Sequence, residues 1–269
     1  MDFTKFKPAL SRYAALVVTG GSSGIGAEMI QRFHQAAPDT RIFNLSRSQP
    51  DAGPAQNQLE HIPCDLTDSD SLTTAEKTLL ARLAALSDGP LLVINNSGIG
   101  HFGLFQEIER EKHLKVIDLN IRGTVDITLR LLPELLKRGG DIMTIASTSA
   151  YQPTPKLSTY GATKSFLMHW SLALSEDLRG TGVRTLVVCP GPTRTAFLDA
   201  AGIDQQAKAP MGFQTTGQVA WASYHALAKG RPLVVPGIAN RLLATVSALG
   251  PKRLSARVAA HIMDTGHGS

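Results

Sequence analysis

The chain has 269 residues, of which 43% are hydrophobic and 18% charged, and its formal net charge is +5. This length fits one large α/β domain or two small ones, and the composition excludes a disordered or collagen-like chain. No stretch holds the roughly 18 consecutive apolar residues that cross a bilayer. The first apolar run, residues 14–18, leads directly into a glycine-rich turn, so we expect a cytoplasmic protein without a signal peptide.

Short β-rich runs alternate with helical patterns along the chain. The predicted strands are residues 15–18, 41–45, 60–64, 91–95, 141–146, 184–189 and 232–235. The predicted helices are residues 26–36, 69–85, 109–138 (one long or two joined), 159–178 and 216–228. This alternation predicts an α/β fold in which a parallel sheet of about seven strands is doubly wound, with helices on both faces.

Two segments between these elements are predicted as loops. Residues 49–58 are rich in Pro, Gly and Gln and are expected on the surface. Residues 196–213 form a longer stretch that we expect to be a lid. Cys64 and Cys189 lie far apart in strand-like surroundings, so we expect buried thiols, no disulfide and no metal site.

No linker divides the chain, and we expect a single domain over residues 1–237 followed by a basic extension over residues 238–269. The apolar residues of the extension have helical spacing on both sides of Pro251. They are Leu242, Leu243, Val246 and Leu249 before it, and Leu254, Val258, Ile262 and Met263 after it.

A glycine-rich turn over residues 19–26 follows the first predicted strand and opens the first long predicted helix. Glycines let a backbone approach a pyrophosphate closely, and a helix N-terminus favours an anion. The alternative is a tight turn that binds no ligand. The residues predicted to contact a dinucleotide here are Gly20, Ser22, Ser23, Gly24, Ile25 and Gly26.

The end of the second predicted strand indicates which dinucleotide fits. An acidic residue there binds the ribose of NAD, whereas an arginine accommodates the 2′-phosphate of NADP. Here Ser46 and Arg47 follow the strand, and no acid occurs before Asp51. We therefore predict NADP(H), with a solvent-exposed arginine of no such role as the alternative.

Tyr160 and Lys164 are four residues apart in a predicted helix, thirteen residues after Ser147. Residues at this spacing share one face of a helix. A lysine ammonium beside a phenol favours the phenolate, so we expect Lys164 to lower the pKa of Tyr160 toward neutral. A phenol tuned in this way both donates and accepts protons.

In this order the motifs resemble the short-chain dehydrogenase/reductase family of the single-domain Tyr-x-x-x-Lys type. The motifs are Thr19–Gly26, Asn95–Gly98, Ser147, Tyr160–Lys164 and Pro190–Gly191, and the resemblance covers residues 12–237. It implies a Rossmann-like fold. Ser97 departs from the alanine usual in the second motif, and we expect little effect because serine is also small.

The resemblance also implies roles for single residues. Tyr160 would exchange a proton with the substrate oxygen, Ser147 would orient that oxygen, and Lys164 would bind the nicotinamide ribose. Asn120 would hold a water that links Lys164 to solvent. Further residues implied to contact the dinucleotide are Asp65, Leu66, Asn96, Ser97, Gly98, Pro190, Gly191, Thr193 and Thr195.

Residues beyond the carboxyl ends of the strands are candidates for substrate contact. They are His101, Phe102, Phe105, Ser147, Thr148, Tyr151, Gln152, Thr193, Phe197, Leu198, Met211 and Phe213. This mostly apolar set favours a lipophilic ketone or aldehyde. A lone histidine such as His101 is more typical of a polar rim than of a catalytic group.

The extension departs from family members that end soon after the last strand, and it resembles a branch with additional C-terminal helices. No Asp or Glu occurs from residue 205 to residue 263, although seven Lys and Arg do. Three roles are open for the extension: a cap over the substrate cleft, a dimer contact, or contact with a membrane surface. We favour packing or dimerisation, and without a nucleic-acid motif we expect no nucleic-acid partner.

The sequence therefore predicts an NADPH-dependent carbonyl reductase, reversible in principle, that forms a homodimer or higher homo-oligomer. One alternative is a 3-oxoacyl thioester reductase of lipid or polyketide assembly. The alternative from another class is a noncatalytic NADP(H)-binding regulator, which would have no need of Ser147, Tyr160, Lys164 and Asn120.

Overall fold

The sheet is the centre of the molecule, and all its strands run parallel. The computed structural model describes residues 1–50, 58–203 and 212–266. The strand order is β3-β2-β1-β4-β5-β6-β7. The strands are β1 (Ala15–Thr19), β2 (Arg41–Ser46), β3 (Leu59–Pro63), β4 (Leu91–Asn95), β5 (Gly140–Ile145), β6 (Val183–Val188) and β7 (Leu233–Val234). The seven predicted strands and the Rossmann-like, doubly wound architecture are confirmed.

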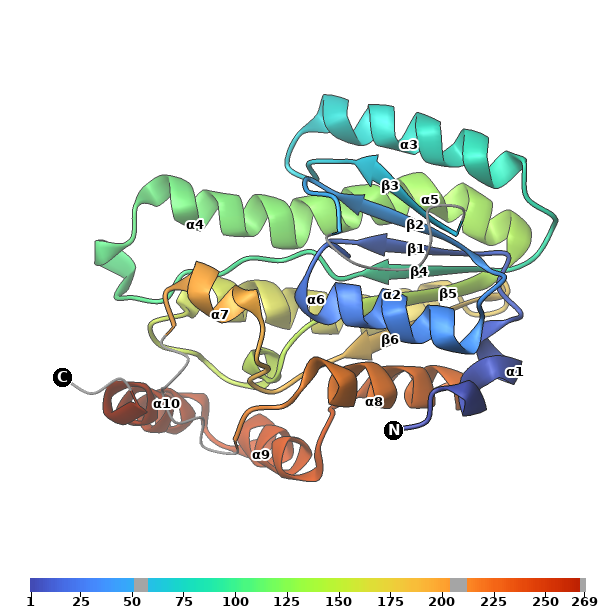
Figure 1. Cartoon of the computed structure of the whole chain (residues 1–269). Helices are drawn as coiled ribbons and strands as arrows, with labels where there is room; N and C mark the ends of the chain where they lie inside the picture. Colours follow the sequence, from blue (N-terminus) through green and yellow to red (C-terminus); the bar gives the residue numbers. More distant parts are fainter. Residues whose placement is uncertain (51–57, 204–211, 267–269) are drawn as a thin grey trace.

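Helices cover both faces of this sheet (Figure 1). The α-helices are α1 (Lys7–Leu10), α2 (Gly24–Ala36), α3 (Ser69–Ala84), α4 (Arg110–Ile117), α5 (Thr124–Arg138), α6 (Ser158–Asp177), α7 (Ala196–Ala201), α8 (Thr216–Ala228), α9 (Ile238–Leu249) and α10 (Lys252–Gly266). Short 3-10 turns are η1 (Thr4–Phe6), η2 (Phe105–Glu107) and η4 (Thr148–Tyr151), and η3 (Asp118–Gly123) is π-helical.

Two apolar layers hold these helices to the sheet. On one face α2 and α8 pack with the N-terminal segment, and Phe33 and Tyr224 are fully buried there. The Tyr224 hydroxyl donates to the carbonyl of Met29 at 2.8 Å, so its polar tip is satisfied within the core. On the other face α3 and α5 bury Leu79 and Leu131 against the strands. This face continues into α6.

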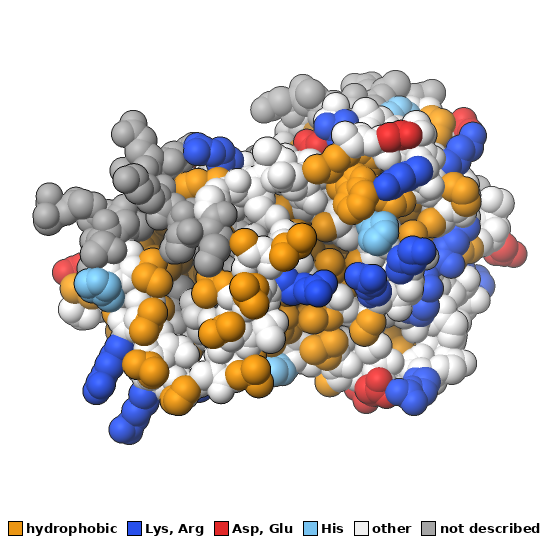
Figure 2. Space-filling model, turned by 90° about the horizontal axis from the view of Figure 1, so that it is seen from below, with side chains coloured by type: hydrophobic (Ala, Val, Ile, Leu, Met, Phe, Trp, Pro, Cys, Tyr) orange, Lys and Arg blue, Asp and Glu red, His pale blue; other side chains and the backbone are white. Residues whose placement is uncertain are grey.

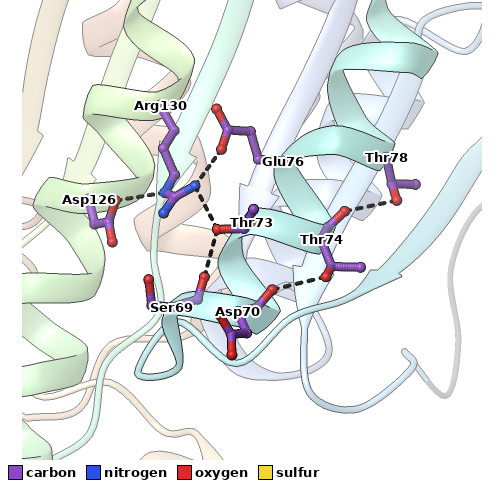
Figure 3. A network of polar contacts seen from close by, with 8 residues as sticks. All are labelled: Ser69, Asp70, Thr73, Thr74, Glu76, Thr78, Asp126 and Arg130. Atoms are coloured by element: carbon purple, nitrogen blue, oxygen red, sulfur yellow. Dashed lines mark hydrogen bonds and ion pairs between the residues drawn. The ribbon is translucent and has the colours of Figure 1, made fainter.

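A polar cluster joins α3 to α5 at the surface of the second face (Figure 3). Arg130 of α5 pairs with Asp126 on its own helix at 2.7 Å and with Glu76 of α3. Its guanidinium also donates to the hydroxyl of Thr73 at 3.2 Å. Arg130 is about one-fifth exposed, so the cluster ties the two helices together more firmly than a fully solvated ion pair would.

The predicted helical region over residues 109–138 is divided by the π-helical segment η3. One π turn is uncommon, and such turns are found disproportionately at functional sites. Gly123 closes the segment against Leu66, because a Cβ there would lie 2.6 Å from the Leu66 carbonyl oxygen. The segment places Asn120 in the interior with no exposed surface.

The C-terminal extension forms the two helices α9 and α10, as its spacing predicted, and Gly250 and Pro251 separate them. Part of the predicted lid is helical, since α7 covers residues 196–201 and ends at Gly202 in the left-handed conformation. Residues 204–211 of that lid lie outside the described part of the chain. Within the described residues, no helix is long and apolar enough to cross a membrane.

Candidate active site

A cavity of about 700 Å³ lies at the carboxyl edge of the sheet. Residues one or two positions beyond the ends of five strands line it: Gly20 after β1, Arg47 after β2, Asp65 after β3, Asn96 after β4 and Ser147 after β5. Open α/β sheets bind ligands at this edge, at the point where the strand order reverses, which here lies between β1 and β4.

The glycine-rich turn forms one end of the cavity. Gly20 and Gly24 have φ angles of +66° and +58°, which favour glycine. Gly26 packs so closely that a Cβ there would lie 2.5 Å from the carbonyl oxygen of Gly20. Among the described residues no side chain caps the first turn of α2, so its N–H groups remain available to an anionic ligand beside Ser22 and Ser23.

Asn44 hydrogen-bonds to this turn, and it is not among the residues predicted from the sequence. It is fully buried in β2, and its Oδ1 accepts from the N–H of Gly21 at 2.8 Å. Asn96 acts from the other side, with its Nδ2 donating to the carbonyl of Gly20 at 2.8 Å. A buried asparagine within an otherwise apolar strand was the signal that could have indicated Asn44.

Arg47 follows β2 and Asp65 follows β3, and both line the cavity. Arg47 is exposed, whereas Ser46 is buried and donates its hydroxyl proton to the carbonyl of Ser48 at 2.8 Å. The N–H and hydroxyl of Thr67 donate to Asp65 at 2.9 and 2.7 Å. Burial alone would raise the pKa of Asp65, but these hydrogen bonds outweigh it and the pKa is lowered.

Ser147, Tyr160 and Lys164 all line the cavity. Ser147 follows β5 and caps η4, where its Oγ accepts from the N–H of Ser149 at 3.1 Å. Tyr160 and Lys164 come from successive turns of α6, as their spacing predicted. Lys164 is 4% exposed, and its Nζ donates to the carbonyl of Ile145 at 2.8 Å.

The expected lowering of the Tyr160 pKa is wrong for this structure. Burial raises the pKa of Tyr160 to about 12, although a hydrogen bond with Ser147 acts in the opposite direction. Burial also lowers the pKa of Lys164 to about 8. The Lys164 Nζ lies 5.6 Å from the centre of the Tyr160 ring and is directed to Ile145. Desolvation of both groups therefore dominates over their mutual attraction.

Asn120 lies behind these residues and does not line the cavity. Its Oδ1 accepts from the N–H of Ile99 at 2.9 Å, and its Nδ2 donates to the hydroxyl of Thr163 at 2.9 Å. A Cβ on Gly98 would lie 3.2 Å from the Lys164 Nζ and 3.3 Å from the Asn120 Oδ1. Gly98 thus lets the lysine and the asparagine approach each other.

Eight of the predicted substrate residues line the cavity: Phe102, Ser147, Thr148, Gln152, Thr193, Phe197, Leu198 and Phe213. The rings of Tyr160 and Phe197 are 5.3 Å apart. His101 and Tyr151 do not line the cavity, and Met211 lies outside the described residues. Phe105 does not line the cavity either.

Most of the remaining residues predicted to contact the dinucleotide line the cavity, and a few do not. Those that line the cavity are Ile25, Leu66, Ser97, Gly98, Pro190, Thr193 and Thr195, whereas Gly26 does not line it. Gly191 does not, because it packs against Asn240 of α9, whose Nδ2 would lie 2.3 Å from an added Cβ. This contact fixes the start of α9 against the end of β6.

The two helices of the extension form the apolar part of the wall. Their cavity-lining residues include Leu243, Ala244, Val246, Leu254, Val258, Ala259, Ile262 and Met263. A cap over the cleft is one of the three roles that the sequence leaves open for the extension, but helical spacing alone does not indicate which face of each helix lines the cavity. Ser247 of α9 donates to Gln152 at 2.7 Å, which fastens the helix beside Ser147.

Lys252 fastens the junction of the two helices. Its Nζ donates to the carbonyls of Ser247 and Ala248 at 3.1 Å each, and to the carbonyl of Tyr151 at 3.2 Å. It therefore binds the last turn of α9 and the segment that follows Ser147 at the same time.

Comparisons with known proteins agree with this arrangement. A family model described as short chain dehydrogenase matches residues 14–206. A serine 3-dehydrogenase of Agrobacterium fabrum is 32% identical over 71% of this chain and 77% of that protein. An uncharacterized oxidoreductase of Escherichia coli, YbbO, is 32% identical over 72% of this chain and 71% of that protein.

Solved structures share the fold. A short-chain dehydrogenase of Burkholderia cenocepacia in complex with NADP has a TM-score of 0.76 and 21% identity, covering 92% of this chain and 98% of that one. A short-chain dehydrogenase of Sphingobium yanoikuyae in complex with NADPH has a TM-score of 0.72 and 26% identity, covering 87% and 92%. The chain belongs to the short-chain dehydrogenase family.

Proposed function

We propose that this protein is a cytoplasmic oxidoreductase that uses NADP(H) to interconvert a lipophilic ketone or aldehyde and its alcohol. One observation carries the proposal: Ser147, Tyr160 and Lys164 share a single cavity with the glycine-rich turn and with the apolar walls of α9 and α10. The three polar side chains suit proton exchange, the glycine-rich turn suits a dinucleotide, and the apolar walls suit a hydrocarbon substrate.

The turn and the residues after β2 to β4 fit a nicotinamide dinucleotide. The uncapped first turn of α2 would hold the pyrophosphate, and Asp65 and Leu66 would contact the adenine. The preference for NADP(H) rests on Arg47, because similar folds have been solved with NADP and with NAD. Arg47 is exposed on the cavity wall, and no described carboxylate lies within ion-pair distance of it, although its charge contributes to lowering the pKa of Asp65. Its guanidinium is therefore available to a 2′-phosphate.

When bound, the nicotinamide supplies or accepts a hydride. Tyr160 retains its proton at neutral pH, because its pKa is about 12, and this proton is available to a carbonyl oxygen. The Ser147 hydroxyl lies beside the phenol and hydrogen-bonds the same oxygen. Lys164, whose pKa is about 8, retains a charge at neutral pH that favours the phenolate as the proton leaves. Asn120 holds the backbone of Ile99 behind it.

The substrate preference follows from the walls opposite Arg47. Apolar side chains of α9 and α10 dominate there, and the Tyr160 ring packs against Phe197. The charged groups on the described wall are Arg47, Asp65 and Lys164, so no described cation serves a substrate carboxylate in the apolar part. A hydrocarbon ketone therefore fits this wall better than the amino acid of the serine dehydrogenase relative.

We also propose that the protein assembles as a homodimer or higher homo-oligomer. Exposed apolar side chains lie on α4 and α5, including Leu114 and Ile117 at 41% each and Leu129 at 60%. Contact between two copies would remove these side chains from water. Sedimentation velocity of the full chain tests this point, and a species with the mass of one chain at micromolar concentration would contradict it.

NADPH oxidation with a panel of carbonyl compounds tests the main proposal. We expect turnover with medium-chain ketones and aldehydes, and little with short charged ketones. Acetoacetyl thioesters form a separate arm of the panel, since preference for them would indicate the 3-oxoacyl reductase. NADPH binding without turnover on any arm would contradict the proposal and favour a regulatory protein.

A further inference from the structure

Helix α9 carries a stripe of exposed apolar side chains. Ile238, Leu242, Val246 and Leu249 are exposed by 90, 65, 60 and 84%. Their spacing places them along one side of the helix. A contiguous exposed patch of large apolar side chains is uncommon on a protein surface, and it usually marks an interaction site.

The stripe continues onto α10 and reaches the rim of the cavity. Leu254, Val258 and Ile262 are exposed by 58, 51 and 37%, and they also line the cavity. Val246 of α9 is likewise both exposed and part of the cavity lining. Viewed from the side of α8 to α10, hydrophobic side chains extend across the surface (Figure 2). The exposed apolar surface is therefore continuous with the lining of the cavity.

Positive charge flanks this apolar surface. Exposed Arg241, Arg253 and Arg257 directly precede Leu242, Leu254 and Val258 in the sequence, which places each arginine about 100° around its helix from an exposed apolar side chain. No Asp or Glu occurs in residues 238–263. Within the described chain none of the three arginines pairs with a carboxylate.

We propose that α9 and α10 dock on a membrane surface that contains anionic phospholipids. The apolar stripe would enter the boundary between headgroups and acyl chains, and the arginines would reach lipid phosphates with their long side chains. The charge decides between a membrane and a second copy of the chain. A twofold contact through this surface would bring the arginines of both copies together with no carboxylate between residues 238 and 263 to pair with them, whereas a bilayer supplies both an apolar layer and negative charge.

Docking in this orientation turns the rim of the cavity toward the bilayer. A lipophilic substrate would then pass from the membrane between Val246 and Leu254 toward Tyr160. This consequence rests on the proposed function, but the docking itself does not, and it is tested without substrate or nicotinamide.

Co-sedimentation of the full-length protein with vesicles tests the docking. We expect binding to vesicles of phosphatidylcholine and phosphatidylglycerol (7:3) at least tenfold tighter than to phosphatidylcholine alone, and a marked loss between 50 and 500 mM NaCl. Binding that is absent, or equal for the two compositions, would overturn the proposal.

Paired variants locate the surface. The double variants Arg253→Glu/Arg257→Glu and Leu242→Ser/Leu249→Ser should each weaken vesicle binding at least about tenfold. Lys77→Glu/Lys137→Glu and Leu136→Ser change exposed residues of the same types on α3 and α5 and should have no effect. NADPH affinity and thermal unfolding verify that each variant is folded. If both α9–α10 variants still bind vesicles as the wild type does, the proposal is overturned. It is also overturned if the wild type does not bind vesicles but self-associates and the two variants do not self-associate, because the surface would then be a contact with a second copy.

Discussion

The two sides of the cavity are built in different ways. The side with the glycine-rich turn consists largely of residues one or two positions beyond the ends of the strands, so the hydrogen bonds of the sheet determine where each side chain lies. The apolar side consists of α9 and α10, which are attached by contacts such as those from Ser247 to Gln152 and from Lys252 to Tyr151. The first side is thus determined by the fold, and the second can vary without change to the sheet.

This contrast predicts that substitutions on the two sides have separate effects. Changes at the turn and on α6 should affect dinucleotide binding or the chemical step. Changes on α9 should affect substrate choice and leave the dinucleotide bound as before. If one substitution changes both dinucleotide binding and substrate choice, the two sides are coupled.

The largest effect is expected for Tyr160→Phe. Removing the phenolic oxygen removes the proton donor, and we expect kcat to fall about 10³-fold. The ring and its packing on Phe197 remain, so the Kd for NADPH should change less than twofold. Stopped-flow oxidation and fluorescence titration measure both quantities, and a kcat close to that of the wild type would exclude Tyr160 as the proton donor.

Lys164→Met should abolish turnover and yet stabilise the fold at pH 7. Burial lowers the lysine pKa from 10.5 to about 8, so below pH 8 the charged group is buried at a cost of about 3 kcal/mol. The lost hydrogen bond to Ile145 offsets part of this cost, and we expect a gain of about 2 kcal/mol in the free energy of unfolding.

The pH dependence of that gain identifies its cause. From pH 8 to 10.5 the unfolded wild type retains the lysine proton and the folded protein has lost it, so wild-type stability rises relative to the variant. Urea unfolding at pH 7 and pH 10 should therefore show the gain shrinking. A gain that is independent of pH would assign it to packing instead of charge.

Leu243→Trp should alter substrate choice alone. The side chain lines the apolar wall, and a larger ring there should raise KM for medium-chain ketones about tenfold through overpacking. Leu242→Trp is the matched control, because this neighbour does not line the cavity and is 65% exposed. Equal effects of the two variants, or a parallel loss of NADPH affinity, would show that the two sides are coupled.

Arg47→Ala should weaken NADPH binding about tenfold, which corresponds to the loss of one charged contact to a phosphate. NADH lacks the 2′-phosphate, so its affinity should remain the same. Isothermal titration with both dinucleotides measures this, and equal weakening of both would assign Arg47 a general electrostatic role.

Most of the fold and much of one side of the site could be predicted from the sequence. Apolar runs separated by helical patterns specified the seven strands, and spacing alone brought Tyr160 and Lys164 onto one face of α6. The sequence did not reveal the π-helical segment at Asn120, because it depends on how Gly123 packs against Leu66. It also misjudged the pKa of Tyr160, since burial is a property of the folded chain.

The apolar wall escaped prediction for a related reason. The spacing of Leu243 and Val246 predicted a helix, but which side of the helix meets the cavity depends on contacts far away in the sequence, such as Asn240 with Gly191. His101 and Tyr151 follow the strands in sequence as expected of substrate residues, yet their side chains do not line the cavity.

The most direct test is the dependence of kcat/KM on chain length for a homologous series of methyl ketones with NADPH. If one cavity joins the Tyr160 proton donor to the walls of α9 and α10, kcat/KM should rise by up to about fourfold for each added methylene until the cavity is filled. Tyr160→Phe should remain inactive throughout the series. Rates that are independent of chain length, or that are highest for the shortest ketones, would contradict this account.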